Sequence, residues 1–461
     1  MNENRTELFA HQQKAVDWII QNDYTGIVSM APGAGGSYTL LGALSELSPD
    51  QTVILLVRDM DSFRYYQALL RENGVPDSDF VLASPTNDNW QSEIQEIKQR
   101  TKIHDGDPNQ NKSLIGSKAP NIVLAPLNTV RREKEVFVSE IPNQVLVVDS
   151  VESAPDMALS DITDLGSKRL GVTTLPLVWF ENYRQDEIEQ HFGDQTYSYS
   201  IKQGIVDNVL NQYEYIPIVT RLSSDESDDL RTLQKKLSKW QAHSNSDESQ
   251  MRMAQAAMQR KQLQADATAK YRKLRDLLRT GIKTPTLIIA GTINQVNKVE
   301  EVFKTGLSEQ SSVYGTPARC TGETGISERN STIQEVFGNY SDKAKTNVVI
   351  ATHAAITNSP TPGARSYIIM SENRNWAANM EILSNALQFS TDQEPVSVYD
   401  IMPLPNLEDE SITGHSSAEG PIQRAGLLTT GANNRYDAQR YLYRQLKKYD
   451  LGHLVYVTPG F

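Results

Sequence analysis

A glycine-rich turn follows the first apolar run of the chain, and turns of this kind can bind phosphate. The run GIVSM (26–30) leads into APGAGGSYTLLGAL (31–44), where glycines precede a helix-forming stretch. Backbone N–H groups of such a turn, together with the N-terminus of the following helix, can surround phosphate oxygens. A tight turn that caps a helix is the alternative interpretation.

The phosphate-binding loop (P-loop) signature ends in Gly-Lys-Ser/Thr, and the chain departs from it at one position. Gly33, Ala34, Gly35 and Ser37 fit the end of such a loop, whereas Gly36 occupies the lysine position. Without that ammonium group, no side chain of the loop neutralises the β and γ phosphates.

The elements around this turn alternate between strands and helices, which is typical of parallel sheets covered by helices. The candidate strands are nearly continuous in apolar residues, as expected of strands buried on both faces. They are GIVSM (26–30), TVILLV (52–57), NIVLAP (121–126), QVLVVD (144–149), RLGVTT (169–174), TLIIAG (286–291), SSVYG (311–315), NVVIAT (347–352), SYIIMS (366–371) and VSVYDIM (396–402).

These patterns divide the 461 residues into two α/β lobes, at 1–205 and 281–402. The polar stretch 86–118 is expected to be a surface insertion in the first lobe. Residues 206–280 are expected to be a helical connector, and residues 403–461 a tail with a terminal helix. In the connector, Leu230, Leu233, Leu237 and Trp240 share one helix face, with Ser223 or Ser224 as the N-cap.

Further segments carry a family resemblance through their order along the chain. LFAHQQKAVDWII (8–20) precedes the turn, and NIVLAPLNTV (121–130), QVLVVDSVESAP (144–155), RLGVTTLP (169–176), TLIIAGTINQVNKVEEVF (286–303), NVVIATHAAITNSPTPGARSYIIMSEN (347–373) and NMEILSNALQFS (379–390) follow it. Over about residues 8–402 the chain resembles the superfamily 2 DNA/RNA helicases (DEAD/DEAH-like), and within them the branch of XPB-like and restriction-type translocases.

The resemblance implies two tandem RecA-like P-loop NTPase lobes of the α/β class, joined by the helical connector. It implies ATP with Mg²⁺ as the cofactor if nucleotide is still bound, and otherwise none. The nucleotide-binding positions it implies are Gln12 on adenine, Gly33, Ala34, Gly35, Gly36, Ser37 and Asp149, with Ser37 and Asp149 as a residual Mg²⁺ site. The alternatives are a solvent-exposed Gln12 at a helix start, and capping roles for Ser37 and Asp149.

The same resemblance indicates that catalytic groups are missing. The general base falls on Ser150, which cannot usefully accept a proton at neutral pH, with Glu152 two residues farther on. The two arginine fingers fall on Asn385 and Gln388. Together with Gly36, these positions predict a pseudoenzyme: a helicase-like nucleic-acid-binding or scaffold subunit of a DNA repair, defence or mobile-element complex. The alternative is an ATP-dependent helicase or translocase whose weak ATPase a partner completes.

Nucleic acid is the expected partner in a cleft between the lobes, because the net charge of −12 argues against a large basic face. The acidic excess is then expected on outer faces, the connector and the tail. A protein partner is expected too, and the tail tyrosines could dock one or pack in a core. The candidate nucleic-acid contacts are Arg58, Thr129, Arg131, Arg132, Thr292, Asn294, Thr352 and His353.

Composition excludes several other classes of protein. The longest apolar runs are too short to span a bilayer, and no export signal opens the chain, so a cytoplasmic location is expected. One cysteine and seven scattered histidines favour neither a disulfide framework nor a zinc site. No constellation of nucleophile and base supports a small-molecule enzyme on a similar sheet.

Overall fold

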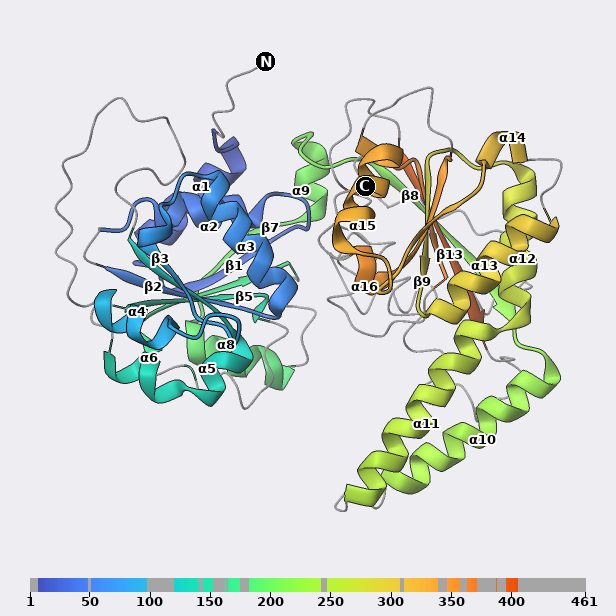
Figure 1. The fold of residues 1–461 in the computed structure, drawn as a ribbon, viewed down its shortest axis with the longest axis horizontal. Helices are drawn as coiled ribbons and strands as arrows, with labels where there is room; N and C mark the ends of the chain where they lie inside the picture. The colour runs from blue at the N-terminus through green and yellow to red at the C-terminus, as the bar shows by residue number, and fades with distance from the viewer. Residues whose placement is uncertain are drawn as a thin grey trace. The chain divides into compact units, whose positions relative to one another are not determined.

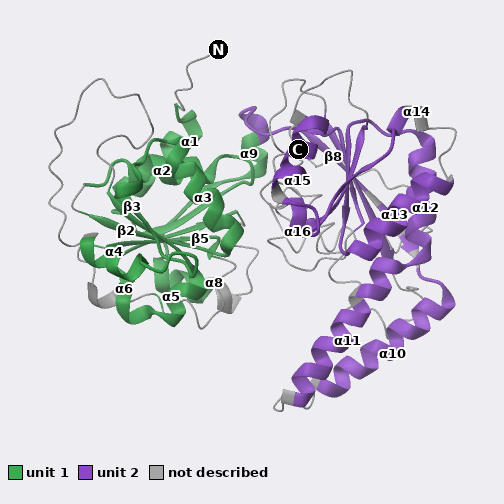
Figure 2. Ribbon diagram, in the orientation of Figure 1, with its two compact units in different colours: residues 1–204 green, residues 205–461 purple. Residues whose placement is uncertain are grey.

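The computed structural model describes residues 7–48, 51–97, 120–140, 144–151, 162, 165–174, 182–241, 247–306, 311–338, 346–356, 363–370, 387 and 395–404. The chain divides into two compact units, Met1–Gly204 (unit 1) and Ile205–Phe461 (unit 2), which Figure 2 shows in different colours. Each unit is built around one parallel sheet.

The sheet of unit 1 has seven strands in the order β3-β4-β2-β5-β6-β1-β7, and all its strand pairs are parallel. Every residue of β1, β2 and β4 is buried, because helices cover both faces. The strands are β1 (Gly26–Met30), β2 (Thr52–Val57), β3 (Phe80–Leu82), β4 (Asn121–Pro126), β5 (Gln144–Asp149), β6 (Lys168–Thr173) and β7 (Thr196–Tyr199).

The helices of unit 1 form a layer on each side of this sheet. They are α1 (Ala10–Gln21), α2 (Gly36–Leu44), α3 (Met60–Glu72), α4 (Trp90–Ile97), α5 (Leu127–Arg132), α6 (Lys134–Glu140), α8 (Asn182–Phe192) and α9 (Ile201–Val206), with a 3₁₀ turn at Asp77–Asp79. Figure 1 shows α1, α2 and α3 on one side and α4, α5, α6 and α8 on the other. One core cluster joins Ile54 and Leu56 of β2 to Trp90 of α4, Phe137 of α6 and Phe192 of α8.

The sheet of unit 2 has six strands in the order β10-β11-β9-β12-β13-β8, again with parallel pairs throughout. Its central strands β9 and β11 are buried at every residue. The strands are β8 (Tyr213–Arg221), β9 (Thr286–Ala290), β10 (Ala318–Cys320), β11 (Val348–Thr352), β12 (Ser366–Ile369) and β13 (Val396–Leu404).

Unit 2 also carries a pair of long helices that extends away from its sheet, α10 (Ser224–Gln241) and α11 (Asp247–Asp266) (Figure 1). Helices α12 and α13 cover one face of the sheet and share a core cluster with β9, which includes Leu274, Val299 and Ile288. The other helices of unit 2 are α12 (Thr268–Thr280), α13 (Ile293–Gly306), α14 (Ser311–Tyr314), α15 (Ile326–Ile333) with a π-helical continuation at Gln334–Gly338, and α16 (His353–Ile356).

The expected elements and the observed ones differ in the second half of the chain. Residues 311–315, expected as a strand, begin with helix α14, and the edge strand of that region is β10. Strand β8 lies within the range 206–280 that was expected to be a helical connector, and it pairs with β13 along its whole length. The expected helix with Ser223 as its N-cap is confirmed as α10, because Ser223 Oγ accepts from Glu226 N at 3.2 Å and Glu226 Oε2 accepts from Ser223 N at 2.8 Å.

Two expected segments lie largely outside the described residues. Helix α4 occupies the start of the polar insertion 86–118, and residues 98–118 are not described. Strand β13 reaches Leu404, whereas the rest of the expected tail 403–461 is not described. None of the helices described is long and apolar enough to cross a membrane.

Candidate nucleotide-binding site

The glycine-rich turn of unit 1 connects the end of β1 to the start of α2, at the carboxyl edge of the sheet. Gly33 and Gly35 both have φ +82, a left-handed conformation that glycine adopts without steric cost. Ala31 N donates to Tyr199 O at 2.8 Å, and Ala34 N donates to Ala31 O at 3.0 Å. The turn thus joins a strand to a helix through two left-handed glycines, and the backbone N–H groups of Ala31 and Ala34 are bonded within unit 1.

Gln12 lies against this turn and holds it. It is 5% exposed, which excludes the interpretation of Gln12 as a solvent-facing residue at a helix start. Its side-chain amide donates to Ala34 O at 3.2 Å and to Gly35 O at 3.5 Å, and its Oε1 accepts from Phe9 N at 2.9 Å. Because those bonds use both ends of the amide, contact with an adenine would require Gln12 to exchange at least one of them.

His11, which the sequence interpretation did not single out, supports the turn from the same helix. Its Nε2 lies 2.8 Å from Ala34 O, so the ring donates to that carbonyl. The ring stacks on Tyr199 at a centroid distance of 4.5 Å, and Phe9 stacks against it at 5.9 Å. The aromatic stack therefore fixes the imidazole in the orientation that bonds the turn.

Gly36, at the lysine position, opens helix α2 and is not crowded. A Cβ added there would meet Met30 Cβ at 3.9 Å, which is ordinary van der Waals contact. A longer side chain therefore starts without a clash at its Cβ, so sterics at that atom would not exclude a lysine at this position.

The structure connects Ser37 and Asp149 through Tyr66, a residue of α3. The Tyr66 hydroxyl is hydrogen-bonded to Ser37 Oγ at 3.3 Å, and it also bonds the Asp149 carboxyl. Tyr66 is only 1% exposed, and burial together with the Asp149 charge raises the pKa of its phenol, which therefore stays protonated. A phenol has one proton to donate, so at any moment it donates either to Ser37 Oγ or to the Asp149 carboxyl.

The Asp149 carboxyl is electrostatically unusual. Although the residue lies at a strand end and is not fully covered, desolvation raises its pKa from 3.8 to about 6. Hydrogen bonds from Tyr66 and from Ser150 N, and the charge of Arg58, lower the pKa of Asp149, but by less than desolvation raises it. Arg58 Nε also pairs with Asp59 at 2.8 Å, and Asp59 caps α3 by accepting from Ser62 N at 2.9 Å.

Of three further positions at which catalytic groups are expected to be missing, the structure describes only Ser150. Ser150, at the base position, has φ +59, a conformation that is uncommon for residues other than glycine. Asn385 and Gln388, at the arginine positions, lie outside the described residues, as does Glu152. Within the described parts of the chain, no group of three or more His, Cys, Asp and Glu side chains is placed to hold a metal ion.

The candidate nucleic-acid contacts of unit 1 follow strand ends of its sheet. Arg58 follows β2, and Thr129, Arg131 and Arg132 lie on α5 directly after β4. Arg131 and Arg132 are exposed in the last turn of that helix. The parallel order of β2 and β4 puts both groups at the edge that carries the glycine-rich turn.

The candidates of unit 2 follow two neighbouring strands, β9 and β11. Thr292 Oγ1 accepts from Gln295 N at 3.1 Å, so Thr292 caps the start of α13. Thr352 is 8% exposed at the end of β11, and His353 begins α16. The Asn294 amide donates to both carboxylate oxygens of Asp266, at 3.2 and 3.1 Å, so this residue already has an intramolecular partner.

No protein-family model matches the chain, and no curated protein does. Solved structures do resemble it. The DNA-bound structure of LlaBIII, an ATP-dependent Type ISP restriction-modification enzyme, aligns with a TM-score of 0.63 at 13% identity, over 98% of this chain and 31% of that one. A fragment described as the HsdR subunit of a type I restriction enzyme from Vibrio vulnificus YJ016 aligns with a TM-score of 0.50 at 12% identity, over 88% of this chain and 65% of that one.

The present chain thus spans about a third of the length of the first of these structures. Identities of 12–13% establish the fold and nothing finer. Together with the two parallel sheets, each flanked by helices, the likeness assigns the chain to the α/β class with two tandem RecA-like lobes.

Proposed function

We propose that the protein is a non-hydrolysing helicase-like subunit that binds DNA or RNA, or acts as a scaffold, in a repair, defence or mobile-element complex. One observation supports the proposal: the glycine-rich turn joins β1 to α2 as expected of a phosphate-binding turn, whereas the side chains around it lack a cation or are engaged elsewhere. Gly36 supplies no cation although its Cβ position is open, and Ser37 and Asp149 both bond Tyr66.

The arrangement around Asp149 does not fit a Mg²⁺ site as it stands. Mg²⁺ requires near-octahedral oxygen ligation at about 2.0–2.1 Å, with one or two carboxylates and the phosphates of the nucleotide. An ion bound by both Ser37 and Asp149 would have to displace the Tyr66 hydroxyl from both partners. Any residual nucleotide binding is therefore expected to depend weakly on Mg²⁺.

Two observations support nucleic-acid binding: the positions of the candidate residues at strand ends, and the similarity of the fold to a DNA-bound structure. Arg58, Arg131 and Arg132 in unit 1, and Thr352 in unit 2, follow carboxyl ends of parallel strands, the edge at which open α/β sheets bind ligands. The first similar structure is that of an enzyme bound to DNA. We propose the whole candidate set, with Thr129, Thr292, Asn294 and His353, as phosphate contacts that fix position without reading sequence.

The first test of the proposal is an ATPase assay on the full chain, with and without duplex and single-stranded DNA and RNA. We expect no turnover above a protein-free blank. Turnover of about 1 s⁻¹, which is ordinary for an enzyme, would contradict the proposal and favour a working translocase.

A second test restores the missing groups together as Gly36→Lys, Ser150→Glu, Asn385→Arg and Gln388→Arg, with Tyr66→Phe added to release Ser37 and Asp149. We expect this variant to bind ATP more tightly in Mg²⁺ than in EDTA by calorimetry, and to hydrolyse it. The matched control carries Gly36→Met in place of Gly36→Lys, since methionine fills similar space without charge. If the control behaves like the restored variant, the assignment of the lysine position to Gly36 is wrong.

A further inference from the structure

The long helices α10 and α11 form an arm whose outer part is not needed for the core of unit 2. The 20 residues of α11 span about 30 Å at ~1.5 Å per residue. The apolar cluster of the arm, Leu222, Leu230 and Ala267 with Leu263 packed against it, lies where the arm joins the unit. Farther out, Arg260 donates to Gln234 at 3.5 Å, and Arg252 lies over the Trp240 ring at 4.6 Å.

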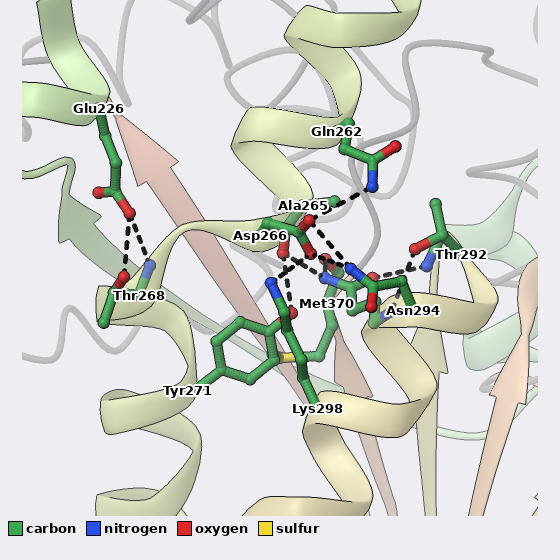
Figure 3. A network of polar contacts seen from close by, with 12 residues as sticks. Glu226, Gln262, Ala265, Asp266, Thr268, Tyr271, Thr292, Asn294, Lys298 and Met370 are labelled. Atoms are coloured by element: carbon green, nitrogen blue, oxygen red, sulfur yellow. Dashed lines mark hydrogen bonds and ion pairs between the residues drawn. The ribbon is translucent and has the colours of Figure 1, made fainter. Parts of the chain in front are cut away.

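Polar contacts at the root join the arm to the rest of unit 2, as Figure 3 shows. The Asp266 carboxylate, at the end of α11, pairs with Lys298 of α13 at 2.9 Å. Gln295, which is fully buried, donates to Ala265 O at 2.9 Å and to Met370 O at 2.8 Å. The arm end, helix α13 and the end of β12 are thereby tied together.

The start of α10 is held at the same root. Glu226 accepts from Thr268 N at 2.9 Å and from Thr268 Oγ1 at 3.1 Å, which joins α10 to the start of α12 (Figure 3). Partial burial acts to raise the pKa of Glu226, but the hydrogen bonds from Thr268 and Ser223 lower it overall, so the carboxylate stays ionised. The start of α10 and the end of α11 are thus both anchored at the root, from which the two helices project.

Charge is distributed unevenly between this region and the rest of the chain. In the outer part of the arm, residues 231–261 contain 7 Lys and Arg against 2 Asp and Glu, whereas the remainder of the chain contains 38 against 55. The expectation of an acidic connector is therefore wrong beyond residue 230. The acids of α10 gather in its first turns at 225–229, next to the root.

The outward face of α10 presents lysines. Lys235, Lys236 and Lys239 are exposed, opposite the face that buries Leu230 and Leu233. Lys239 lies four residues after Lys235 and three after Lys236, so it neighbours both on the helix surface. Lysine is a compact point charge on a flexible stem, which suits contact with phosphates irrespective of base sequence.

We propose that the outer half of this arm binds the phosphate backbone of nucleic acid through Lys235, Lys236 and Lys239. The inference rests on the proposed function. It adds a nucleic-acid-binding surface that is separate from the glycine-rich turn and from the strand ends. A basic projection from an otherwise acidic protein concentrates the attraction for a polyanion at one place. The outer half of the arm is thus a local basic surface on a chain whose net charge is −12.

The test uses the full chain and labelled duplex and single-stranded DNA, titrated at several salt concentrations from 50 to 200 mM. The variant Lys235→Gln/Lys236→Gln/Lys239→Gln removes three charges while keeping good helix formers. We expect its affinity at 50 mM salt to fall at least about 10-fold, and the slope of log K against log salt to decrease by about 3 for duplex. Circular dichroism and thermal melting check that the arm stays folded.

The matched control is Lys14→Gln/Lys202→Gln/Lys304→Gln, which removes the same charge from exposed helix positions outside the arm. We expect this control to change affinity by no more than about 2-fold. If the wild type binds and the two triple variants behave alike, the arm does not contact nucleic acid while the proposed function stands. If the wild type binds neither DNA form at 50 mM salt, nor the matching RNA, the nucleic-acid part of the proposed function fails and the arm proposal fails with it.

A protein partner on the arm would give a different result. Met251 and Met258 on α11 are 74% and 72% exposed and offer flexible apolar surface. If a protein rather than nucleic acid covers the arm, the lysine variant keeps the wild-type salt slope, and that outcome overturns the proposal.

Discussion

The Asp149 carboxyl makes the stability of unit 1 depend on pH. Its pKa of about 6 in the folded protein lies above the ordinary 3.8, so the folded state holds its proton more tightly than the unfolded chain. The stabilisation of the folded state by protonation of Asp149 is fully present below pH 3.8 and is lost as pH rises through about 6. At neutral pH Asp149 is therefore a desolvated carboxylate, which lowers the stability of the folded state.

We predict that Asp149→Asn stabilises unit 1 at pH 7.5 by up to about 3 kcal/mol and has little effect near pH 4. Asparagine has the same size, and its carbonyl can still accept from Tyr66. The measurement is the melting temperature of the variant minus that of wild type across pH 4–8. An equal difference at both ends of that range would show that Asp149 titrates normally.

At the scale of single residues, sequence reasoning identified some members of the candidate site and missed others for a physical reason. Ser37 and Asp149 were identifiable from local signals, because Ser37 directly follows a glycine-rich turn and Asp149 ends a buried strand. Tyr66 was not, since it is 29 residues from Ser37 and 83 from Asp149 along the chain and lies in an ordinary amphipathic helix. Only the packing of α3 against the sheet brings its hydroxyl between them.

At the scale of elements, the strands that sequence reasoning missed are the four edge strands. The two sheets begin and end with β3 and β7, and with β10 and β8. A central strand is covered on both faces and needs a continuous apolar run, whereas an edge strand can be short, polar or interrupted. Strand β3 has three residues, β7 reads TYSY, and β8 contains Pro217, which edge strands tolerate.

The turn before α2 depends on the absence of a side chain at Gly35. A Cβ at this residue would lie 2.0 Å from Gln12 Nε2, and its φ of +82 is also unfavourable for alanine. We predict that Gly35→Ala destabilises the protein more than Gly281→Ala, by about 1–3 kcal/mol, because Gln12 must give up its bond to Ala34. Gly281 is the matched control, since its φ is +85 and a Cβ there meets nothing within 4 Å.

Chemical denaturation of both variants measures this difference, and a double-mutant cycle identifies its origin. Gln12→Ala removes the group that clashes, so Gly35→Ala should cost less in that background than in wild type. If the two substitutions simply add, the cost at Gly35 comes from its backbone conformation and not from Gln12.

At the scale of the whole molecule, each unit has a main core cluster of its own among the residues that the structure describes. The main cluster of unit 1 contains Ile54 and Phe192, and that of unit 2 contains Ile288 and Leu278, with no residue in common. Chains with more than one domain commonly depart from two-state unfolding. We predict that calorimetry resolves two transitions, that Gly35→Ala lowers only one of them, and that Gly281→Ala lowers only the other, by about 2–4 °C per kcal/mol. A single transition that both variants lower would mean that the two cores unfold as one cooperative unit.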